Sequence, residues 1–245
     1  MKDSLKKLML CPLIAILLVI LAPAFAAAGF SDVSSASFYS DAISWAVDVG
    51  IASGFEDNTF RPNQTCTSCQ ILILLWRSCG SPVADGHHQY TDVPKGIYYE
   101  QVADWAYQTG LVTGTQFQPE KPCTRSMAVN YMWQVYGRPQ VSGSSTFSDV
   151  SPNAAYAQAV AWAAEKGITS GTEDGTTFSP DMTCTRGQIV TFLHRNALQS
   201  NSSTYPVTDN ALSSSALDLF DNTNPASSED NSADSFDADY LDIIV

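Results

Sequence analysis

One sequence pattern occurs three times between residues 30 and 198, and it limits the possible folds more than any other feature. Each copy opens with an aromatic residue, a hydroxyl residue, aspartate and valine. These openings read FSDV, YTDV and FSDV and begin at residues 30, 90 and 147. A repeat of this length is usually one supersecondary unit that cannot bury its apolar face alone. The chain must therefore fold by packing the copies on one another.

The first half of each copy predicts a short helix. Small apolar residues lie around Trp45, Trp105 and Trp162 at the i, i+3, i+4 spacing of one buried helix face. A glycine follows each pattern, at positions 50, 110 and 167. Glycine is the residue best suited to the left-handed conformation that ends a helix. Three helices with defined ends are expected.

The second half of each copy predicts another helix, which begins at the phrases CTSCQ, CTRSM and CTRGQ. Thr67 and Thr185 are each followed three residues later by glutamine, which predicts a capping box at the helix start. Thr124 is followed by Met127, so only half of that box can form there. Each copy is expected to be a helix, a turn-rich loop and a second helix.

Both ends of the chain differ from the repeats. Residues 1–28 place lysines before an apolar run that ends in alanines, which predicts a cleaved secretory signal peptide and no transmembrane anchor after cleavage. A retained membrane anchor is the alternative. Residues 199–245 hold nine acidic residues and no Lys or Arg, which predicts a disordered acidic tail. Such a tail could recruit a surface-protein partner.

Composition excludes several kinds of partner. The formal net charge of −13 argues against binding to nucleic acid. Cys66 and Cys69 form a C-x-x-C pair without a second pair to complete a zinc site, and the three histidines are scattered. The aspartates Asp32, Asp92 and Asp149 of the opening motif are interpreted as turn or cap residues. No metal or cofactor is predicted.

The fixed order of these motifs resembles the S-layer homology domain in three tandem copies. The resemblance covers residues 30–198 and divides them into repeats at 29–82, 83–140 and 141–198. It implies a mostly α fold in which three helix-loop-helix repeats pack as a pseudo-threefold bundle. It also implies that the protein is secreted and held non-covalently at the bacterial cell wall or cell surface. The implied partner is secondary cell-wall polysaccharide with acidic pyruvyl groups, bound in grooves between neighbouring repeats.

The same resemblance places Arg125 and Arg186, the arginines of the T-R motif, at the sugar acid. A guanidinium at the positive end of a helix suits a planar carboxylate. We expect that replacing either arginine weakens wall binding and leaves the melting temperature nearly unchanged. The alternative is that each pairs with a nearby Asp or Glu and only stiffens the bundle. In repeat 1, Ser68 occupies the arginine position, which puts that groove in doubt. Arg61 could compensate, and an ordinary surface arginine is the alternative.

Two further sets of residues are candidates for ligand binding. Trp45, Trp105 and Trp162 could stack on sugar rings, although their helical spacing also suits packing in the core. The second set consists of glycines in the loops after the first helices, which could let a ligand approach the backbone or could supply a positive φ. These glycines are Gly54, Gly114 and Gly171.

An enzymatic function is the alternative to a binding module. The chain could be a cell-wall hydrolase, or a thiol oxidoreductase that uses Cys66 and Cys69. The repeats occupy nearly all of the chain that is expected to be ordered, and no carboxylate pair or nucleophile with its base stands out. The sequence therefore predicts a binding module and not an enzyme.

Overall fold

The computed structural model describes residues 29–172 and 175–200. The chain divides into two compact units at residue 30, and the three repeats belong to the unit that begins at Ser31. The proposed signal peptide and nearly all of the acidic tail lie outside the described residues. In the described part, the structure contains six α-helices and no strand, so the mostly α prediction is confirmed.

Each repeat contributes two helices. The first helices of the three repeats are α1 (Ser40–Asp48), α3 (Glu100–Gln108) and α5 (Ala157–Glu165). The second helices are α2 (Ser68–Ser78), α4 (Arg125–Val135) and α6 (Arg186–Ser200). Among the described residues, no helix has the length and apolar character needed to cross a membrane.

The first helices end at the predicted glycines. Gly50, Gly110 and Gly167 have φ values of 73°, 69° and 65°. In repeat 3, the Gly167 N–H donates to the Ala164 carbonyl at 3.0 Å, and the Ile168 N–H donates to the Ala163 carbonyl at 2.8 Å. This pair of hydrogen bonds is the Schellman motif, and it recurs in the other two repeats.

The second helices begin as the sequence predicts. The Thr67 side chain accepts a hydrogen bond from the Gln70 N–H, and the Gln70 side chain accepts one from the Thr67 N–H. Thr185 and Gln188 exchange the same two bonds. Thr124 caps α4 by accepting from the Met127 N–H, and methionine cannot return the bond. The half capping box expected in repeat 2 is confirmed.

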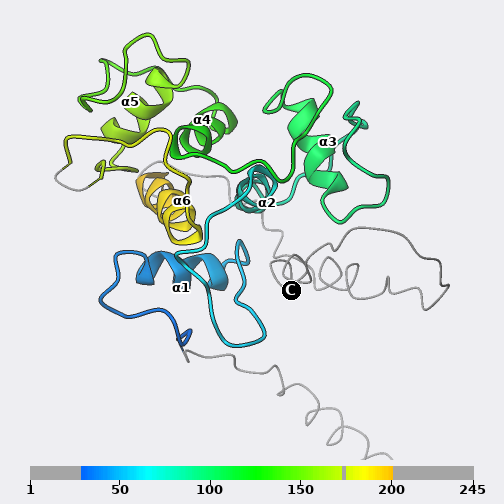
Figure 1. Ribbon diagram of the computed structural model, residues 1–245, viewed down its shortest axis with the longest axis horizontal. Coiled ribbons are helices and arrows are strands. Elements are labelled where there is room, and N and C mark those ends of the chain that lie inside the picture. Colours follow the sequence, from blue (N-terminus) through cyan, green and yellow to red (C-terminus); the bar gives the residue numbers. More distant parts are fainter. Residues whose placement is uncertain (1–28, 173–174, 201–245) are drawn as a thin grey trace, which may run out of the picture. The chain divides into compact units, whose positions relative to one another are not determined.

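Each first helix packs on the second helix of the preceding repeat (Figure 1). Thus α3 packs on α2, α5 packs on α4, and α1 packs on α6. The last contact joins repeat 3 back to repeat 1 and closes a ring. We call the three contacts junction 1–2 (α2 with repeat 2), junction 2–3 (α4 with repeat 3) and junction 3–1 (α6 with repeat 1).

A triangle of backbone hydrogen bonds lies where the three repeats meet. The N–H groups of Cys66, Cys123 and Cys184 donate to the carbonyls of Cys184, Cys66 and Cys123 at 2.9, 3.0 and 2.8 Å. Isolated antiparallel bridges flank the triangle in the same cyclic order: Thr65 with Thr185, Thr67 with Pro122, and Thr124 with Thr183. This cyclic pattern confirms the pseudo-threefold arrangement of the repeats.

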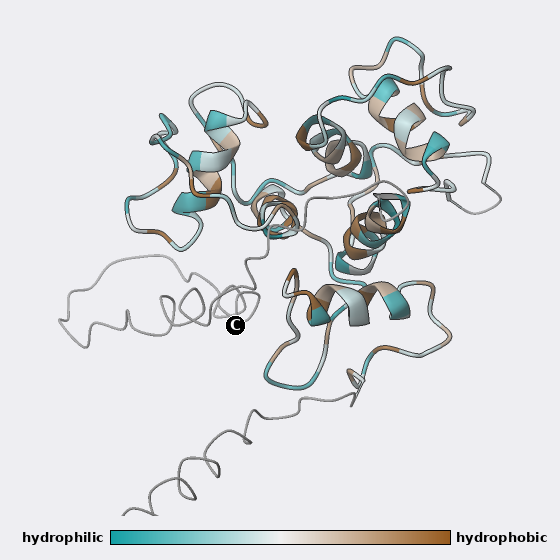
Figure 2. Ribbon diagram, turned by 180° about the vertical axis from the view of Figure 1, so that it is seen from behind, coloured by the Kyte–Doolittle hydropathy of each residue, from teal (hydrophilic) through white to brown (hydrophobic). Residues whose placement is uncertain are grey.

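The hydrophobic core is centred on the second helices. These helices lie between the first helices in Figure 1, and Figure 2 shows hydrophobic residues along them. In α2, every residue from Ser68 to Leu75 is buried. The first helices bury a narrower stripe; α1 buries Ala42, Ile43 and Ala46. The second helices therefore form the inner layer and the first helices the outer one.

The aspartates of the opening motif hold a loop in place and do not cap helices. The carboxylate of Asp149 accepts hydrogen bonds from the N–H groups of Phe178 and Ser179 at 2.8 and 2.7 Å. Asp32 and Asp92 make the equivalent pairs of bonds in repeats 1 and 2. The second donor of each pair has a φ near +55°, an unfavourable conformation for a side-chain-bearing residue. The aspartate bonds offset that strain.

The helix-ending glycines give a stability prediction. We expect Gly167→Ala to lower the free energy of unfolding by about 1 kcal/mol, because alanine is strained at φ 65° although the space around its Cβ would be open. For a domain of this size the melting temperature should fall by about 2–4 °C. Thermal unfolding followed by circular dichroism measures the change. Gly143→Ala is the matched control, since Gly143 also has open space but no positive φ; equal melting temperatures of the two variants would contradict the prediction.

Candidate functional site: the repeat junctions

The two T-R arginines lie at repeat junctions, where the sequence resemblance places the grooves. Each is the first residue of its helix, α4 or α6. The Arg125 Nε donates to the Phe178 carbonyl across junction 2–3 at 2.9 Å. The Arg186 Nε donates to the Phe60 carbonyl across junction 3–1 at 3.0 Å, and its Nη2 donates to the Ser53 carbonyl at 3.0 Å. Both side chains therefore bind the backbone of the next repeat.

Both arginines are buried among aromatic rings. Arg125 and Arg186 are 3% and 2% exposed. The guanidinium of Arg125 lies 4.9 Å from the Phe178 ring centroid, and that of Arg186 lies 4.6 Å from the Phe60 centroid. Burial lowers the pKa of both guanidinium groups, although an arginine in a protein stays protonated. Each side chain cross-links two repeats through hydrogen bonds to backbone carbonyls. The charges of Asp149 and Asp32 add a weaker attraction to Arg125 and Arg186, respectively.

Arg125 retains an unused hydrogen-bond donor. Its Nη2 is buried and has no hydrogen-bond partner among the described residues. When a buried charged group lacks one of its hydrogen bonds, the folded protein is less stable by an amount comparable to the free energy of that bond. An oxygen-bearing ligand that reached junction 2–3 could satisfy this donor.

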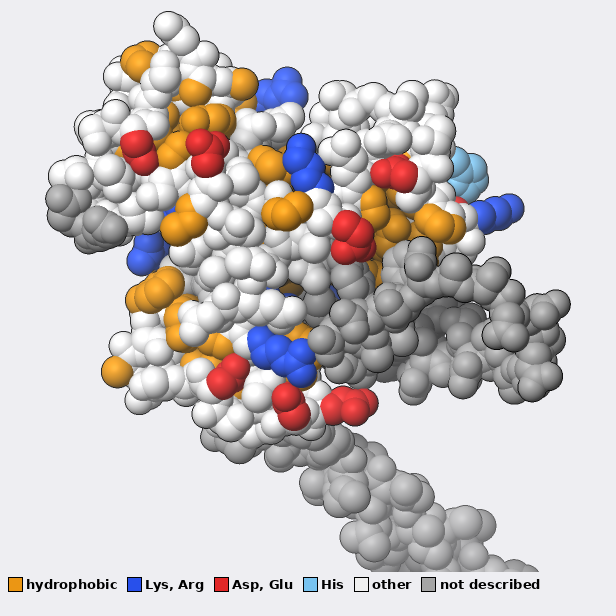
Figure 3. Space-filling model, viewed as in Figure 1, with side chains coloured by type: hydrophobic (Ala, Val, Ile, Leu, Met, Phe, Trp, Pro, Cys, Tyr) orange, Lys and Arg blue, Asp and Glu red, His pale blue; other side chains and the backbone are white. Residues whose placement is uncertain are grey.

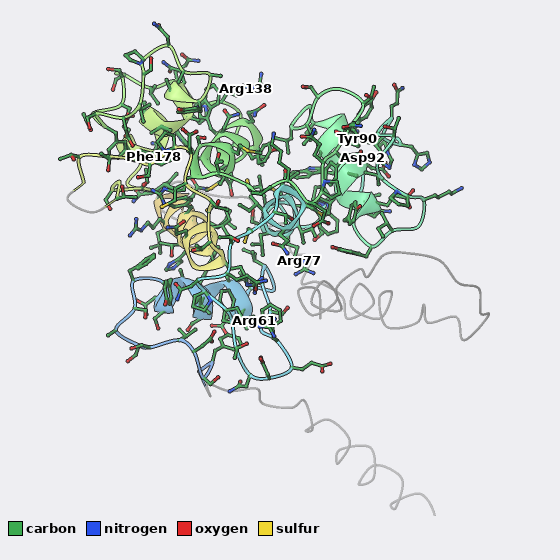
Figure 4. The ribbon with its side chains drawn as sticks, viewed as in Figure 1. Arg61, Arg77, Tyr90, Asp92, Arg138 and Phe178 are labelled. Carbon is green, nitrogen blue, oxygen red and sulfur yellow. The ribbon has the colours of Figure 1, made fainter. Side chains whose placement is uncertain are left out.

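Junction 3–1 gathers three arginines. Arg61 lies in the loop after α1 and Arg77 extends from α2 toward the α1 region (Figure 4). The Arg77 Nη1 donates to the Ile51 carbonyl at 3.5 Å, two residues from the Ser53 carbonyl that Arg186 binds. Burial is the main cause of the lowered Arg186 pKa, and the charges of Arg61 and Arg77 lower that pKa further. The three positive groups are thus close enough to repel one another.

Acidic groups offset part of this charge. The Arg61 Nη2 lies 3.4 Å from the Asp57 Oδ2, and this ion pair is partly exposed. The Arg61 guanidinium also stacks 3.8 Å from the centroid of the Phe55 ring. Figure 3 shows basic side chains flanked by acidic ones over the part that carries α1. Exposed ion pairs of this kind contribute little to stability.

Junction 1–2 contains an open cavity in place of an arginine. Ser68 occupies the first position of α2, and its Oγ lies 3.2 Å from the Tyr131 Oη. The cavity beside them has a volume of about 460 Å³. It is lined by Ser68, Leu111, Val112, Thr113, Thr115, Gln116, Phe117, Gln118, Lys121, Met127 and Tyr131. The groove that the sequence put in doubt therefore has space for a ligand.

The three tryptophans are not brought together into one site. Trp105 and Trp162 are 5% and 3% exposed and belong to the core. Trp45 is half-buried, and its ring lies 5.1 Å from the ring of His194 on α6. It also lines a smaller cavity of about 170 Å³. Trp105 and Trp162 therefore pack in the core, which was the alternative to stacking on sugar rings.

The candidate glycines lie in the loops at the three junctions. Gly54 follows Ser53, whose carbonyl binds Arg186. Gly114 has a φ of 96° and lies between Thr113 and Thr115, which line the cavity of junction 1–2. Gly171 has a φ of 85°, and a Cβ there would lie 2.6 Å from the Phe147 ring. Gly171 is required by loop conformation and packing.

The thiols of the C-x-x-C pair are not arranged for redox chemistry. All five described cysteines are free, and Cys66 and Cys69 are buried. Burial raises the pKa of the Cys66 thiol to about 12, with a smaller opposing effect from Arg186, and burial also raises that of Cys69. A thiol that reacts as a nucleophile needs a lowered pKa. Residues 29–172 and 175–200 also contain no group of three His, Cys, Asp or Glu side chains that could hold a metal ion.

Three residues at the junctions were not identified as site residues from the sequence: Arg77, Lys121 and Tyr131. Arg61 was considered only as a substitute for the missing arginine of repeat 1. Helical periodicity shows which side of a helix is buried, but it does not show which repeat lies against it. For Lys121 the sequence did contain a signal. It lies two residues before the shared cysteine, where the other two repeats have the uncharged residues Gln64 and Met182.

Comparison with known proteins identifies the repeats. Residues 29–67, 89–128 and 146–190 match the S-layer homology domain. An amylopullulanase of Thermoanaerobacterium thermosulfurigenes is 26% identical over 165 residues, which are 61% of this chain and 9% of that protein. The exoglucanase XynX of Acetivibrio thermocellus is 23% identical over 64% of this chain and 16% of its own length. The surface-layer 125 kDa protein of Lysinibacillus sphaericus is 24% identical over 71% of this chain and 15% of its own length.

This chain spans at most 16% of the length of these relatives. The shared part is the repeat region, which is a binding module and not a catalytic domain. Proteins with this domain attach to the cell wall or the cell surface. Three matches in tandem, on three interlocked helix-loop-helix units, show that the chain belongs to the S-layer homology domain family.

Proposed function

We propose that the repeats bind an acidic polysaccharide of the bacterial cell wall and so hold the protein at the surface without a covalent bond. The observation that carries this proposal is the gathering of Arg61, Arg77 and Arg186 at junction 3–1 in a chain whose net charge is −13. Like charges brought together create a positive potential that favours binding of an anion. The wall polymer supplies such anions in a repeating array.

The acidic group best suited to this junction is a carboxylate such as that of a pyruvyl ketal. Its two coplanar oxygens match the paired N–H groups of a guanidinium, and such hydrogen bonds are stronger than neutral ones. Arg61 is the most accessible of the three arginines for this contact, with its side chain 30% exposed. The unused Nη2 of Arg125 supports a second contact at junction 2–3.

The sequence-based roles of Arg125 and Arg186 change in one respect. Both remain candidates for ligand binding, but both are also buried cross-links between repeats. Their substitution should therefore affect stability as well as binding. The ligand contact is better tested at Arg61 and Arg77, which lie at the same junction and are less buried.

Binding should weaken when these two arginines are removed. We expect the double variant Arg61→Ala, Arg77→Ala to bind purified cell walls about tenfold more weakly or worse, because charge-assisted hydrogen bonds to the polymer are lost. Arg138→Ala is the matched control, since Arg138 is an exposed arginine at the end of α4 (Figure 4). Co-sedimentation with walls, before and after mild acid hydrolysis of ketal groups, measures the effect. Equal binding by the double variant and by wild type would refute the role of junction 3–1.

Substitution of Arg186 should destabilise the fold. We expect Arg186→Ala to lower the free energy of unfolding by about 2 kcal/mol or more, because two backbone carbonyls, one buried and one partly buried, lose a charged donor and the side chain leaves a cavity. Chemical denaturation measures this change, and Arg138→Ala again serves as the control. An unchanged free energy of unfolding would show that the cross-link does not stabilise the ring.

A further inference from the structure

We infer that an acidic segment of this chain, residues 229–242, docks on the end of the bundle at which α2, α4 and α6 end, and that it competes there with the wall polymer. The docking depends only on contacts within the chain, whereas the competition rests on the proposed function. We call this surface the basic end, after its three arginines. They are Arg77, Arg138 and Arg195.

Each repeat places one of these arginines near the end of its second helix. Arg77 and Arg195 occupy the same position in α2 and α6. Each donates through its Nη1 to the carbonyl of the isoleucine directly after the helix-ending glycine of its own repeat, at 3.5 and 3.2 Å. Gln134 has this position in α4, and Arg138 donates to its Oε1 at 2.9 Å. The three repeats thus supply three positive charges to one end of the bundle.

These arginines bind neutral oxygens and no acidic group. Across residues 29–172 and 175–200, neither ion pair involves any of the three. A guanidinium has five N–H donors, and each arginine uses one of them in the bonds above. Arg138 is exposed, and Arg77 and Arg195 are partly exposed. The basic end therefore keeps positive charge and hydrogen-bond donors for an acidic partner.

A small apolar cavity lies among the same three helix ends. Ser78, Tyr136 and Asn196 line it, and each lies one or two residues from one of the three arginines. The rest of its lining consists of Trp45, Ile51, Leu193 and Ala197. Its volume of about 170 Å³ is enough for one aromatic ring. The partner that fits this surface is acidic and carries an aromatic side chain.

The segment 229–242 has both properties. Residues 201–245 contain nine Asp or Glu and no Lys or Arg, and six of the nine lie in this segment. Phe236, Tyr240 and Leu241 are interspersed with these acidic residues. Carboxylates can bind the guanidinium groups through charge-assisted hydrogen bonds while one aromatic ring fills the cavity. The chain therefore contains a partner that matches the basic end in charge and in apolar content.

The point of attachment favours docking within one chain. Ala197 lines the cavity, and α6 continues only to Ser200. Residues 201–228 connect this helix end to the acidic segment. A linker of about 28 residues spans roughly 30 Å on average, or about three helix diameters. The segment is therefore present at the basic end at an effective concentration on the order of millimolar.

Docking limits wall binding because Arg77 belongs to both surfaces. Arg77 is one of the three arginines gathered at junction 3–1, where the polymer is proposed to bind. A carboxylate of the segment that binds Arg77 neutralises part of the positive potential at that junction. The acidic segment thus takes the place of the polymer until wall anions displace it.

Two triple variants with the same change of charge test the inference. The segment variant carries Asp234→Asn, Asp237→Asn and Asp239→Asn. The linker variant is the matched control and carries Asp209→Asn, Asp218→Asn and Asp221→Asn. Circular dichroism confirms that both variants of the full chain are folded.

Nuclear magnetic resonance of the full chain detects docking in the absence of any polymer. We expect the segment variant to shift the Nε–H signals of Arg77, Arg138 and Arg195, because their carboxylate partners are lost. The signal of Arg125, which is buried at junction 2–3, should stay in place and serves as the internal control. The linker variant should leave all four signals close to those of wild type.

Co-sedimentation with purified cell walls at low ionic strength tests the competition. We expect the segment variant to bind at least about threefold more tightly than wild type. A threefold gain corresponds to a site that the acidic segment occupies about two thirds of the time. The linker variant should stay within about twofold of wild type.

Unchanged arginine signals in the segment variant, or equal effects of the two variants, would overturn the inference. The arginines would then only offset the dipoles at the helix ends. Shifted signals without tighter wall binding would overturn the competition. Shifted signals in a chain that does not bind walls at all, as wild type or as variant, would support the docking and refute the proposed function.

Discussion

The closed interlock of the three repeats is the constraint on which the other features depend. No repeat packs its first helix mainly on its own second helix; each first helix packs on the helix of the preceding copy, and α1 closes the ring on α6. The hydrogen-bonded triangle of Cys66, Cys123 and Cys184 fixes this order at the centre. Because every junction joins two copies, a side chain at the start of a second helix meets the loop of its neighbour. The arginine position therefore lies at an interface between repeats.

The first residue of the second helix has opposite effects on its junction in different repeats. Arg125 and Arg186 extend into the neighbouring repeat, bind its backbone and become buried. Ser68 is too short for the same contact, and a cavity remains beside it. Around Arg186 the additional charges of Arg61 and Arg77 favour an anion, whereas the cavity at Ser68 offers mostly neutral polar groups. Three copies of one unit thus form three chemically different junctions.

Local structure could be predicted from the sequence, and contacts between repeats could not. Thr67, Thr124 and the helix-ending glycines specify helix boundaries through bonds to residues a few positions away, so their roles were predicted correctly. The aspartates of the opening motif lie in turns, as one of the two interpretations predicted. Their carboxylates bind residues 25 to 30 positions away, so the helix-cap interpretation was wrong. Arg186 meets a loop 126 residues earlier in the chain. Helical periodicity gives no information on contacts between residues so far apart in the chain. Neither the burial of Arg186 nor its proximity to Arg61 and Arg77 could therefore be inferred.

Ring closure also fixes how many copies the module can contain. In an open solenoid, a repeat can be gained or lost at an end, and the remaining units keep their neighbours. Here the last second helix, α6, packs on the first helix of the array, α1, so removal or addition of one copy would break a junction. The triangle of backbone bonds has three corners and cannot accept a fourth. Divergence within this part of the chain is therefore confined to changes that keep three copies, such as different side chains at each junction and different loop lengths between Gly54, Gly114 or Gly171 and Phe60, Phe117 or Phe178, respectively.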